Sequence, residues 1–408
     1  MIDRAEIIRL AGELGLQPRV VEKDYVLGWV LAGIARDEEL SRAWLFKGGT
    51  CLKKCFFETY RFSEDLDFTV MEPVQLDRDF LIPRFKALGV WLYDTTGIEL
   101  PAELLRFDVY DLRTGGRAGE GRLAYRGPIA PRGGDLPRIK LDLTADERMV
   151  LPSVIRPVTH PYSDAPVEGM TARCYAFEEL FGEKVRALAQ RTRPRDLYDV
   201  INLFRHGDFR NASAMIRDIV TQKCSFKQIP FPTFASLAPA QPELVGEWGN
   251  MLGHQLPSLP PVDLFWDALP EFFRWLGGAV IQPLLPSHPI GVGAPVLRGP
   301  AGGIRIPGRS TPFIEVIRFA ASNHLLVELD YRDEDGRRGT REIEAYSLRR
   351  TKDDNIILCA VNVEKQEPRS YRIERIQGAT IMSRGFTPRF QIELTPSGPL
   401  AAPGVMVL

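Results

Sequence analysis

Apolar residues recur at helical spacing over about the first 40 residues of the chain, which predicts an amphipathic helical start. From about residue 41 to 150 helix-like and strand-like segments alternate, and from about 170 to 280 the pattern is helical. After a helix predicted at 311–322, strand-like runs follow at 325–331, 341–348, 355–363, 369–376 and 390–394. The pattern therefore predicts an α+β protein with a separate β-rich module near its end.

Proline and glycine mark the main boundary between these parts. Six prolines alternate with six glycines between residues 282 and 309, a composition typical of an extended linker. We therefore divide the chain into a core with N-terminal helices at 1–170, a helical lobe at 171–281, a linker at 282–310 and the β-rich module at 311–408.

A glycine-rich turn precedes a pair of carboxylates. The run Lys47-Gly48-Gly49-Thr50 follows a strand-like segment and opens an amphipathic stretch, and Asp65 and Asp67 come after it. Helix N-termini attract phosphate, and glycine lets the backbone approach an anion closely. Residues two apart on a strand share a face, so both carboxylates point to one side and form a hard-oxygen site suited to Mg²⁺. A plain turn and a solvated strand edge are the alternatives.

A third carboxylate lies on a later strand-like run. In residues 138–144, Ile139, Leu141 and Leu143 alternate with polar residues, which places Asp142 on the polar face. Asp142 could therefore complete a site with Asp65 and Asp67. Ser63, two residues before Asp65, is a further candidate for contact with phosphate or water.

These motifs resemble the nucleotidyltransferases of the DNA polymerase beta superfamily and, more narrowly, the AbiEii toxins of bacterial phage-defence and toxin-antitoxin systems. The resemblance covers about the first 280 residues and rests on five blocks in order. The blocks are 22–25 (EKDY), 47–50 (KGGT), 61–67 (RFSEDLD), 140–142 (KLD) and a fifth that contains Glu178, Lys184, Arg191 and 195–199 (RDLYD).

The resemblance implies a nucleotidyltransferase toxin that binds an NTP and Mg²⁺, with Mn²⁺ as the alternative ion. It implies an RNA acceptor, with tRNA expected, and a cognate antitoxin. The expected metal ligands are Asp65, Asp67 and Asp142. These three residues and Lys184 are the expected catalytic residues. The expected nucleotide contacts are Lys47, Gly48, Gly49, Thr50, Ser63, Lys184, Arg191, Arg195, Asp196 and Asp199.

Simpler structural roles compete with some of these assignments. Lys184 borders an apolar helical stripe, where a lysine can lay its stem on the core and keep its ammonium in water. Arg195 and Asp199 stand four residues apart on the next predicted helix and can pair with each other.

The β-rich module resembles a WYL domain, which implies a small SH3-like β-barrel. The matching segments are 328–332 (ELDYR), 341–346 (REIEAY) and 371–376 (YRIERI), whereas Ile356-Ile357-Leu358 stands at the Trp-Tyr-Leu position. The resemblance implies that Arg341, Arg372 and Arg375 of this chain would contact a nucleotide or single-stranded nucleic acid. A structural or dimerising module is the alternative.

Charge and cysteine content narrow the picture. With 52 Lys and Arg against 53 Asp and Glu, the chain as a whole is no general nucleic-acid binder. Between residues 113 and 140, however, seven basic residues face only two acidic ones, which predicts a basic rim beside the site. The five cysteines lack zinc-site spacing, and we interpret Cys51 and Cys55 as small buried residues. No segment is apolar for long enough to span a membrane and the first residues do not resemble a signal peptide, so we expect a cytoplasmic protein.

Two functions from different classes follow. The first is a toxin that transfers nucleotides from NTP to RNA. The second is a regulatory protein in which a non-catalytic transferase fold supports a ligand-sensing WYL-like module. A third option keeps the enzyme and changes the acceptor to a protein or a small molecule.

Overall fold

The computed structural model describes residues 1–57, 60–113, 115–129, 135–206, 211–281, 284, 294–295, 312–351, 353 and 355–394. The predicted linker at 282–310 and the end of the chain after 394 therefore lie almost wholly outside the described residues, as does the predicted cap Thr311.

The chain begins with helices, as predicted. The cap of the first helix is visible in its contacts: the Asp3 carboxylate accepts a hydrogen bond from the Glu6 backbone at 2.8 Å, and Gly15 ends the helix with φ 65°. The helices of the core are α1 (Arg4–Leu14), α2 (Pro18–Arg36), α3 (Glu38–Ala43), α4 (Gly48–Cys51) and α5 (Arg78–Thr96). A π-helical turn, Leu52–Phe56, continues α4, and single 3₁₀ turns lie at Pro73–Gln75 and Ala102–Leu104.

A seven-stranded mixed sheet forms the centre of the core. Its strands are β1 (Trp44–Lys47), β2 (Asp65–Val70), β3 (Arg106–Asp111), β4 (Arg117–Ala124), β5 (Arg138–Thr144), β6 (Val154–Pro157) and β7 (Thr171–Cys174), in the order β3-β4-β5-β2-β1-β7-β6. The pairs β2–β5 and β1–β7 are parallel, whereas the other neighbours are antiparallel. β7 thus extends the sheet slightly past residue 170, where we placed the start of the helical lobe.

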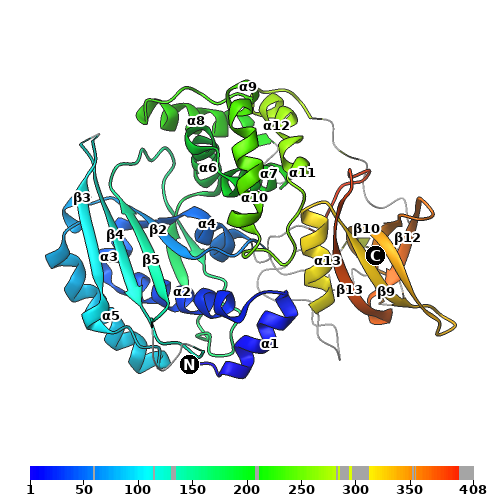
Figure 1. Ribbon diagram of the computed structural model, residues 1–408, viewed down its shortest axis with the longest axis horizontal. Coiled ribbons are helices and arrows are strands. Elements are labelled where there is room, and N and C mark those ends of the chain that lie inside the picture. Colours follow the sequence, from blue (N-terminus) through cyan, green and yellow to red (C-terminus); the bar gives the residue numbers. More distant parts are fainter. Residues whose placement is uncertain are drawn as a thin grey trace.

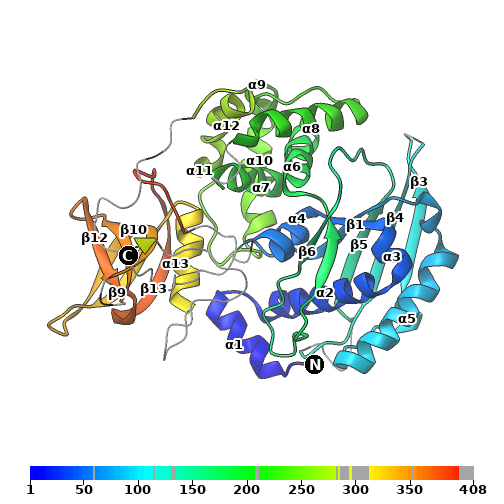
Figure 2. The same cartoon turned by 180° about the vertical axis from the view of Figure 1, so that it is seen from behind.

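The two faces of the central strands differ as their alternation predicts. Leu66 and Phe68 are buried, and the ring of Phe68 packs against Trp44, which in turn contacts Phe85 of α5. Helices α2 and α5 lie along this apolar face of the sheet (Figures 1 and 2). The polar residues of β2 and β5 therefore point to the opposite face.

A helical lobe follows β7 and stands beside the sheet (Figure 1). Its helices are α6 (Phe177–Arg191), α7 (Pro194–Arg205), α8 (Ser213–Phe226), α9 (Phe234–Leu237), α10 (Gln241–Leu252), α11 (Asp263–Trp266) and α12 (Leu269–Leu276), with a 3₁₀ turn at Ala238–Ala240. Aromatic rings fill the lobe: Phe181 stacks on Trp275 and Phe272, and Tyr198 stacks on Phe265. The predicted helical segment is confirmed.

The last described part is helix α13 (Pro312–Ser322) and an antiparallel sheet. Its strands are β9 (Leu325–Arg332), β10 (Arg338–Arg350), β11 (Ile356–Asn362), β12 (Glu367–Arg372) and β13 (Ile376–Gly385), in the order β12-β11-β10-β9-β13, and β8 (Ala294–Pro295) pairs with β10. A 3₁₀ turn, Ile373–Arg375, joins β12 to β13.

The prediction of a strand at 390–394 is wrong, because the last long strand is β13. The segment 390–394 alternates well, but its apolar residues pack against Tyr346: Phe390 meets that ring edge-on, and the Glu393 amide bonds to the Tyr346 carbonyl. The segment thus packs on β10 through side chains and isolated backbone bonds, and it forms no continuous strand.

No helix in the part of the chain that the structure describes is long and apolar enough to cross a bilayer.

Candidate active site

Five strands contribute paired residues to one row across the polar face of the sheet. Lys47 on β1 pairs with Asp67 on β2, Asp67 with Asp142 on β5, Asp142 with Glu120 on β4, and Glu120 with Asp108 on β3. Residues paired in register point to the same face. The structure therefore brings Asp67 and Asp142 side by side, although 75 positions separate them in the sequence.

A second row, two residues away along β2, contains mainly cations. Asp65 pairs with Lys140, and Lys140 pairs with Arg122. The Lys140 ammonium lies 2.8 Å from an Asp142 carboxylate oxygen and 3.2 Å from one of Glu120. Lys140 therefore neutralises part of the negative charge that the first row concentrates.

The central carboxylates hold their protons unusually well. Burial, and then the negative charge of Asp142, raise the pKa of Asp67 to about 6, although Lys184 and Lys47 oppose the shift. Burial also raises the pKa of Asp65, where Asp142 adds to the shift and Lys23 opposes it. A bound cation would relieve this repulsion, and carboxylate oxygens are the ligands that Mg²⁺ prefers. The donor set of Asp65, Asp67 and Asp142 thus has the chemistry that a divalent metal ion prefers, although oxygens of all three carboxylates do not lie within 4.8 Å of one another in the described structure.

The two glycines leave room for other side chains of the site. A Cβ at Gly48 would lie 2.1 Å from an Asp67 carboxylate oxygen, and Gly48 has φ +81°, which disfavours any other residue. A Cβ at Gly49 would lie 2.4 Å from the Arg61 guanidinium. The close approach of Asp67 and Arg61 therefore requires glycine at positions 48 and 49, whether or not the turn binds a ligand.

Buried Asp199 links the strand region to the helical lobe. Arg61 donates two hydrogen bonds to its carboxylate at 2.7 Å each, Tyr60 donates a third at 2.9 Å, and the Lys184 ammonium lies 2.8 Å away. Burial alone would raise the pKa of Asp199, but Arg61 and Lys184 hold it well below its ordinary value. The Lys184 ammonium, which also lies 3.8 Å from Asp196, is thus held between two carboxylates of α7.

Arg191 and Arg195 have different partners from each other. Arg191 donates to both oxygens of buried Asp196, at 2.6 and 2.9 Å, and its side chain remains about half exposed. Arg195 does not pair with Asp199, as the helical spacing allowed, because its guanidinium donates to the Met251 carbonyl at 3.2 Å. Its charge acts on Asp65 and Glu64.

The other predicted nucleotide contacts lie nearby. The ammonium of Lys47 is 3.3 Å from Glu147 and 3.7 Å from Glu183, so two buried carboxylates engage it. The Thr50 hydroxyl donates to the Asp65 backbone carbonyl and ties the glycine turn to β2. Ser63 lies in the segment that leads into β2.

Four residues of this region were not among the predicted site residues: Lys23, Arg61, Glu120 and Lys140. Lys23 of α2 lies 3.0 Å from Glu64, beside Asp65. Lys23 and Arg61 both occur in the family blocks, and Lys140 directly precedes Leu141-Asp142. Glu120 had no such signal, because only the β4–β5 register places it next to Asp142.

The predicted basic rim is more neutral than the sequence window indicated. Arg117, Arg122 and Arg126 lie 3.4, 2.7 and 2.8 Å from Asp111, Glu120 and Glu99. Two of these acids precede residue 113, so a count over 113–140 omitted them. Arg113 and Arg138 are exposed, and Arg132 lies outside the described residues.

In the WYL-like module, the three predicted ligand contacts have local partners. Arg341 donates to the Thr340 carbonyl at 2.7 Å, Arg372 lies 3.6 Å from Glu374, and Arg375 lies 3.0 Å from Glu334. Their role in binding a ligand stays a prediction.

Comparison with known families decides the assignment of the core. The family model described as "Nucleotidyl transferase AbiEii toxin, Type IV TA system" matches residues 29–276, which is more than half of the chain. The chain belongs to the AbiEii nucleotidyl transferase toxin family. A second model, the WYL domain, matches residues 312–381. Both predicted resemblances are therefore confirmed.

Solved structures and curated proteins add less. MenT4, a nucleotidyltransferase toxin of Mycobacterium tuberculosis H37Rv, is 17% identical and covers 69% of this chain and 91% of its own, with a TM-score of 0.43. The proteasome accessory factor PafBC of Arthrobacter aurescens is 15% identical, covers 52% of this chain and 32% of its own, and has a TM-score of 0.19. No curated protein matches the chain.

The family assignment makes the chain a nucleotidyltransferase of the toxin type. Toxins of this family use an NTP and a divalent metal ion, act on nucleic acid and have an antitoxin partner.

Gly48→Ala tests the packing of the glycine turn. The new methyl group would clash with Asp67 and force a left-handed backbone on alanine, so we expect the free energy of unfolding to fall by about 1–3 kcal/mol. Gly246→Ala is the matched control, because nothing lies within 4 Å of a Cβ built there. Urea titration of both variants measures the difference. Equal stability of Gly48→Ala and the wild type would contradict the close contact.

Asp67→Asn tests the electrostatic repulsion in metal-free buffer. The folded protein binds a proton at Asp67 more tightly than the unfolded chain does, so the wild type loses stability as pH rises from 3.8 to about 6. At pH above this window we expect the variant to be more stable by on the order of 1–2 kcal/mol, a gain that vanishes below it. Thermal unfolding across pH measures it, with exposed Asp108→Asn as control. A variant no more stable than the wild type at alkaline pH would refute the prediction.

Proposed function

We propose that the protein transfers nucleotides from an NTP to an RNA acceptor, expected to be tRNA, in a Mg²⁺-dependent reaction, with Mn²⁺ as the alternative ion. The observation that carries the proposal is the register of β2 and β5, which pairs Asp67 with Asp142 and leaves Asp65 on the same face. Three carboxylates that repel one another have a chemical purpose when they share a cation.

Asp65, Asp67 and Asp142 would hold the metal. When bound, Mg²⁺ would polarise the triphosphate and lower the pKa of the attacking acceptor hydroxyl. The chain itself supplies position and charge, the two contributions that dominate nucleotidyl transfer because the protein makes no covalent bond to the nucleotide.

Arg191 and Lys184 are the best candidates for contact with the triphosphate. Arg191 is half exposed, is fixed by Asp196 and acts electrostatically on Asp67. Lys184 also acts on Asp67 and is fixed by Asp199. Because both cations are held by buried carboxylates, they would meet the phosphates with little loss of side-chain freedom. Arg195 and Lys23 stand on the Asp65 side and would face the acceptor strand.

An RNA acceptor is supported by the cations at the edge of the sheet. Arg113 and Arg138 are exposed, and Lys140 and Arg122 form the row next to the carboxylates. Phosphate groups of an RNA end would compete with Glu120 and Asp142 for these cations, which predicts a salt-dependent interaction.

Nucleotide transfer tests the proposal directly. Purified full-length protein would be incubated with each labelled NTP, total tRNA and Mg²⁺. We expect label in RNA, and a loss of at least about 10³-fold in rate for Asp65→Asn/Asp67→Asn, since two of the carboxylates that would hold the metal are then lost. Asp108→Asn, at the far end of the same row, is the control that should keep its activity.

The location of the label separates the alternatives. Label in protein or in a small molecule would replace the acceptor but keep the enzyme. Absence of label from every acceptor, with Mg²⁺ and Mn²⁺ both tried, would favour the regulatory function. Growth arrest on expression that persists in the double variant would contradict a catalytic toxin.

Stabilisation by metal provides a second test that needs no acceptor. We expect millimolar Mg²⁺ or Mn²⁺ to raise the melting temperature of the wild type near pH 7, because the ion removes the repulsion that destabilises the ionised cluster. Asp67→Asn should lose most of this rise, and Asp108→Asn should retain it. An equal rise in all three proteins would place the ion elsewhere.

A further inference from the structure

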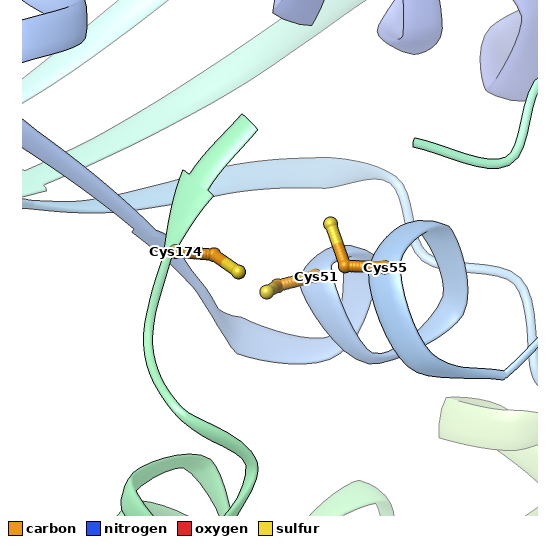
Figure 3. Close-up of side chains that lie close together, drawn as sticks. All are labelled: Cys51, Cys55 and Cys174. Atoms are coloured by element: carbon orange, nitrogen blue, oxygen red, sulfur yellow. The ribbon is translucent and has the colours of Figure 1, made fainter. Parts of the chain in front are cut away.

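Three cysteines meet in the core behind the glycine turn. Cys51 ends α4, Cys55 lies on the π-helical turn after it, and Cys174 ends β7 (Figure 3). Their sulfur atoms all lie within 4.8 Å of one another. Cys174 comes from a strand more than a hundred residues later in the chain, so no sequence spacing announces the cluster.

The cluster belongs to the hydrophobic core, and an arginine lies beside it. Cys51 and Cys174 are fully buried, and Cys55 is 6% exposed. The Arg156 guanidinium donates to the Cys55 carbonyl at 3.4 Å and lies over the Phe56 ring. The three thiols therefore lie together out of contact with bulk water, with a guanidinium beside them.

The local backbone brings Cys51 and Cys55 to the same side. The π-helical turn Leu52–Phe56 is a rare conformation that recurs at functional sites, and it begins directly after Cys51. Register adds the third sulfur, because Cys174 pairs with Phe46 on β1, the strand that leads into the glycine turn.

We propose that Cys51, Cys55 and Cys174 form a binding site for a soft, thiophilic metal ion in three-thiolate coordination. Metal–sulfur bonds of about 2.3 Å in a trigonal plane space the sulfurs by about 4.0 Å, so the observed cluster needs little rearrangement. Thiolates select soft ions such as Cu(I) and Zn(II) over Mg²⁺. Since the described residues supply three sulfur ligands and no fourth, Cu(I) is preferred to Zn(II), which takes four.

Binding involves no oxidation. Each thiol that coordinates the ion releases its proton to solvent, and the net negative charge of the complex is offset in part by Arg156. The bound ion would join β7 to α4, next to Thr50, whose hydroxyl bonds to the Asp65 carbonyl. The ion would thus stabilise the glycine turn that packs against Asp67. Metal binding by the three cysteines does not depend on whether the protein has the proposed transferase activity.

Titration with Cd²⁺, a soft probe ion, tests the site in the full-length protein. Reduced protein would be titrated without oxygen, and sulfur-to-cadmium charge-transfer absorption in the ultraviolet would be followed. We expect saturation at one ion per chain, together with a higher melting temperature. Carboxylates give no such absorption, so the acidic cluster does not contribute.

Cysteine variants provide matched controls. Cys51→Ala and Cys174→Ala should lose the saturable absorption, whereas Cys224→Ala and Cys359→Ala, which remove buried cysteines outside the cluster, should keep it. Circular dichroism would establish that each variant is folded. Should a cluster variant fail to fold, the stoichiometry of the wild type and the Cys224→Ala result still decide.

Three results would overturn the proposal. One is absorption that rises without saturation in the wild type. Another is equal absorption in Cys174→Ala and Cys224→Ala. The third is a disulfide within the cluster in protein purified without oxygen, because the sulfurs would then be unable to coordinate the ion. A Cu(I) titration with a colorimetric competitor would then rank Cu(I) against Zn(II) in a protein that passes the first test.

Discussion

Repulsion between carboxylates on adjacent strands is the constraint that organises this protein. The parallel pairing of β2 with β5 places Asp67 beside Asp142, and folding must tolerate this arrangement before any ligand arrives. Lys140 on one side and Lys184 on the other reduce the repulsion without removing it, since the pKa of Asp67 stays raised. The folded protein thus keeps these carboxylates together at a cost in stability, a pattern common where function requires strain.

Buried ion pairs hold the helical lobe against the sheet. Asp199 of α7 binds Arg61, in the segment that leads into β2. Within the lobe, Lys223 of α8 lies 2.7 Å from Glu179 of α6, with both side chains almost fully buried. Removal of one partner from such a pair leaves an uncompensated charge, which costs about 3–5 kcal/mol. The geometry is therefore specific, and it determines where the cations of α6 and α7 stand relative to the carboxylates.

The WYL-like module is not isolated from this arrangement. Its helix α13 lies next to the helical lobe (Figure 1), and the Leu264 side chain of α11 approaches Gly385 at the end of β13. The Leu264 carbonyl accepts a hydrogen bond from Arg205 of α7 at 2.6 Å. The helix that carries Asp196 and Asp199 is therefore physically connected to the second family domain.

Local chemistry along the chain was enough to predict much of this. Alternation predicted the polar face of β2 and β5, and the ordered blocks led to the family and to Asp65, Asp67 and Asp142 as candidates. Alternation was misleading at 390–394, where the residues pack on Tyr346 without forming a strand. The charge count was misleading at 113–140, because acids outside that window pair with the arginines.

The sequence by itself determined which faces are apolar, because side-chain period follows from backbone geometry within a single element. Only the tertiary structure decided which elements meet. Strand register brought Glu120 to Asp142 and Cys174 to the end of α4. The buried partner of Asp199 is Arg61, not Arg195, which the helical spacing had suggested. Contacts between distant residues depend on how strands are paired and which charges are buried together, and neither is encoded in any local pattern.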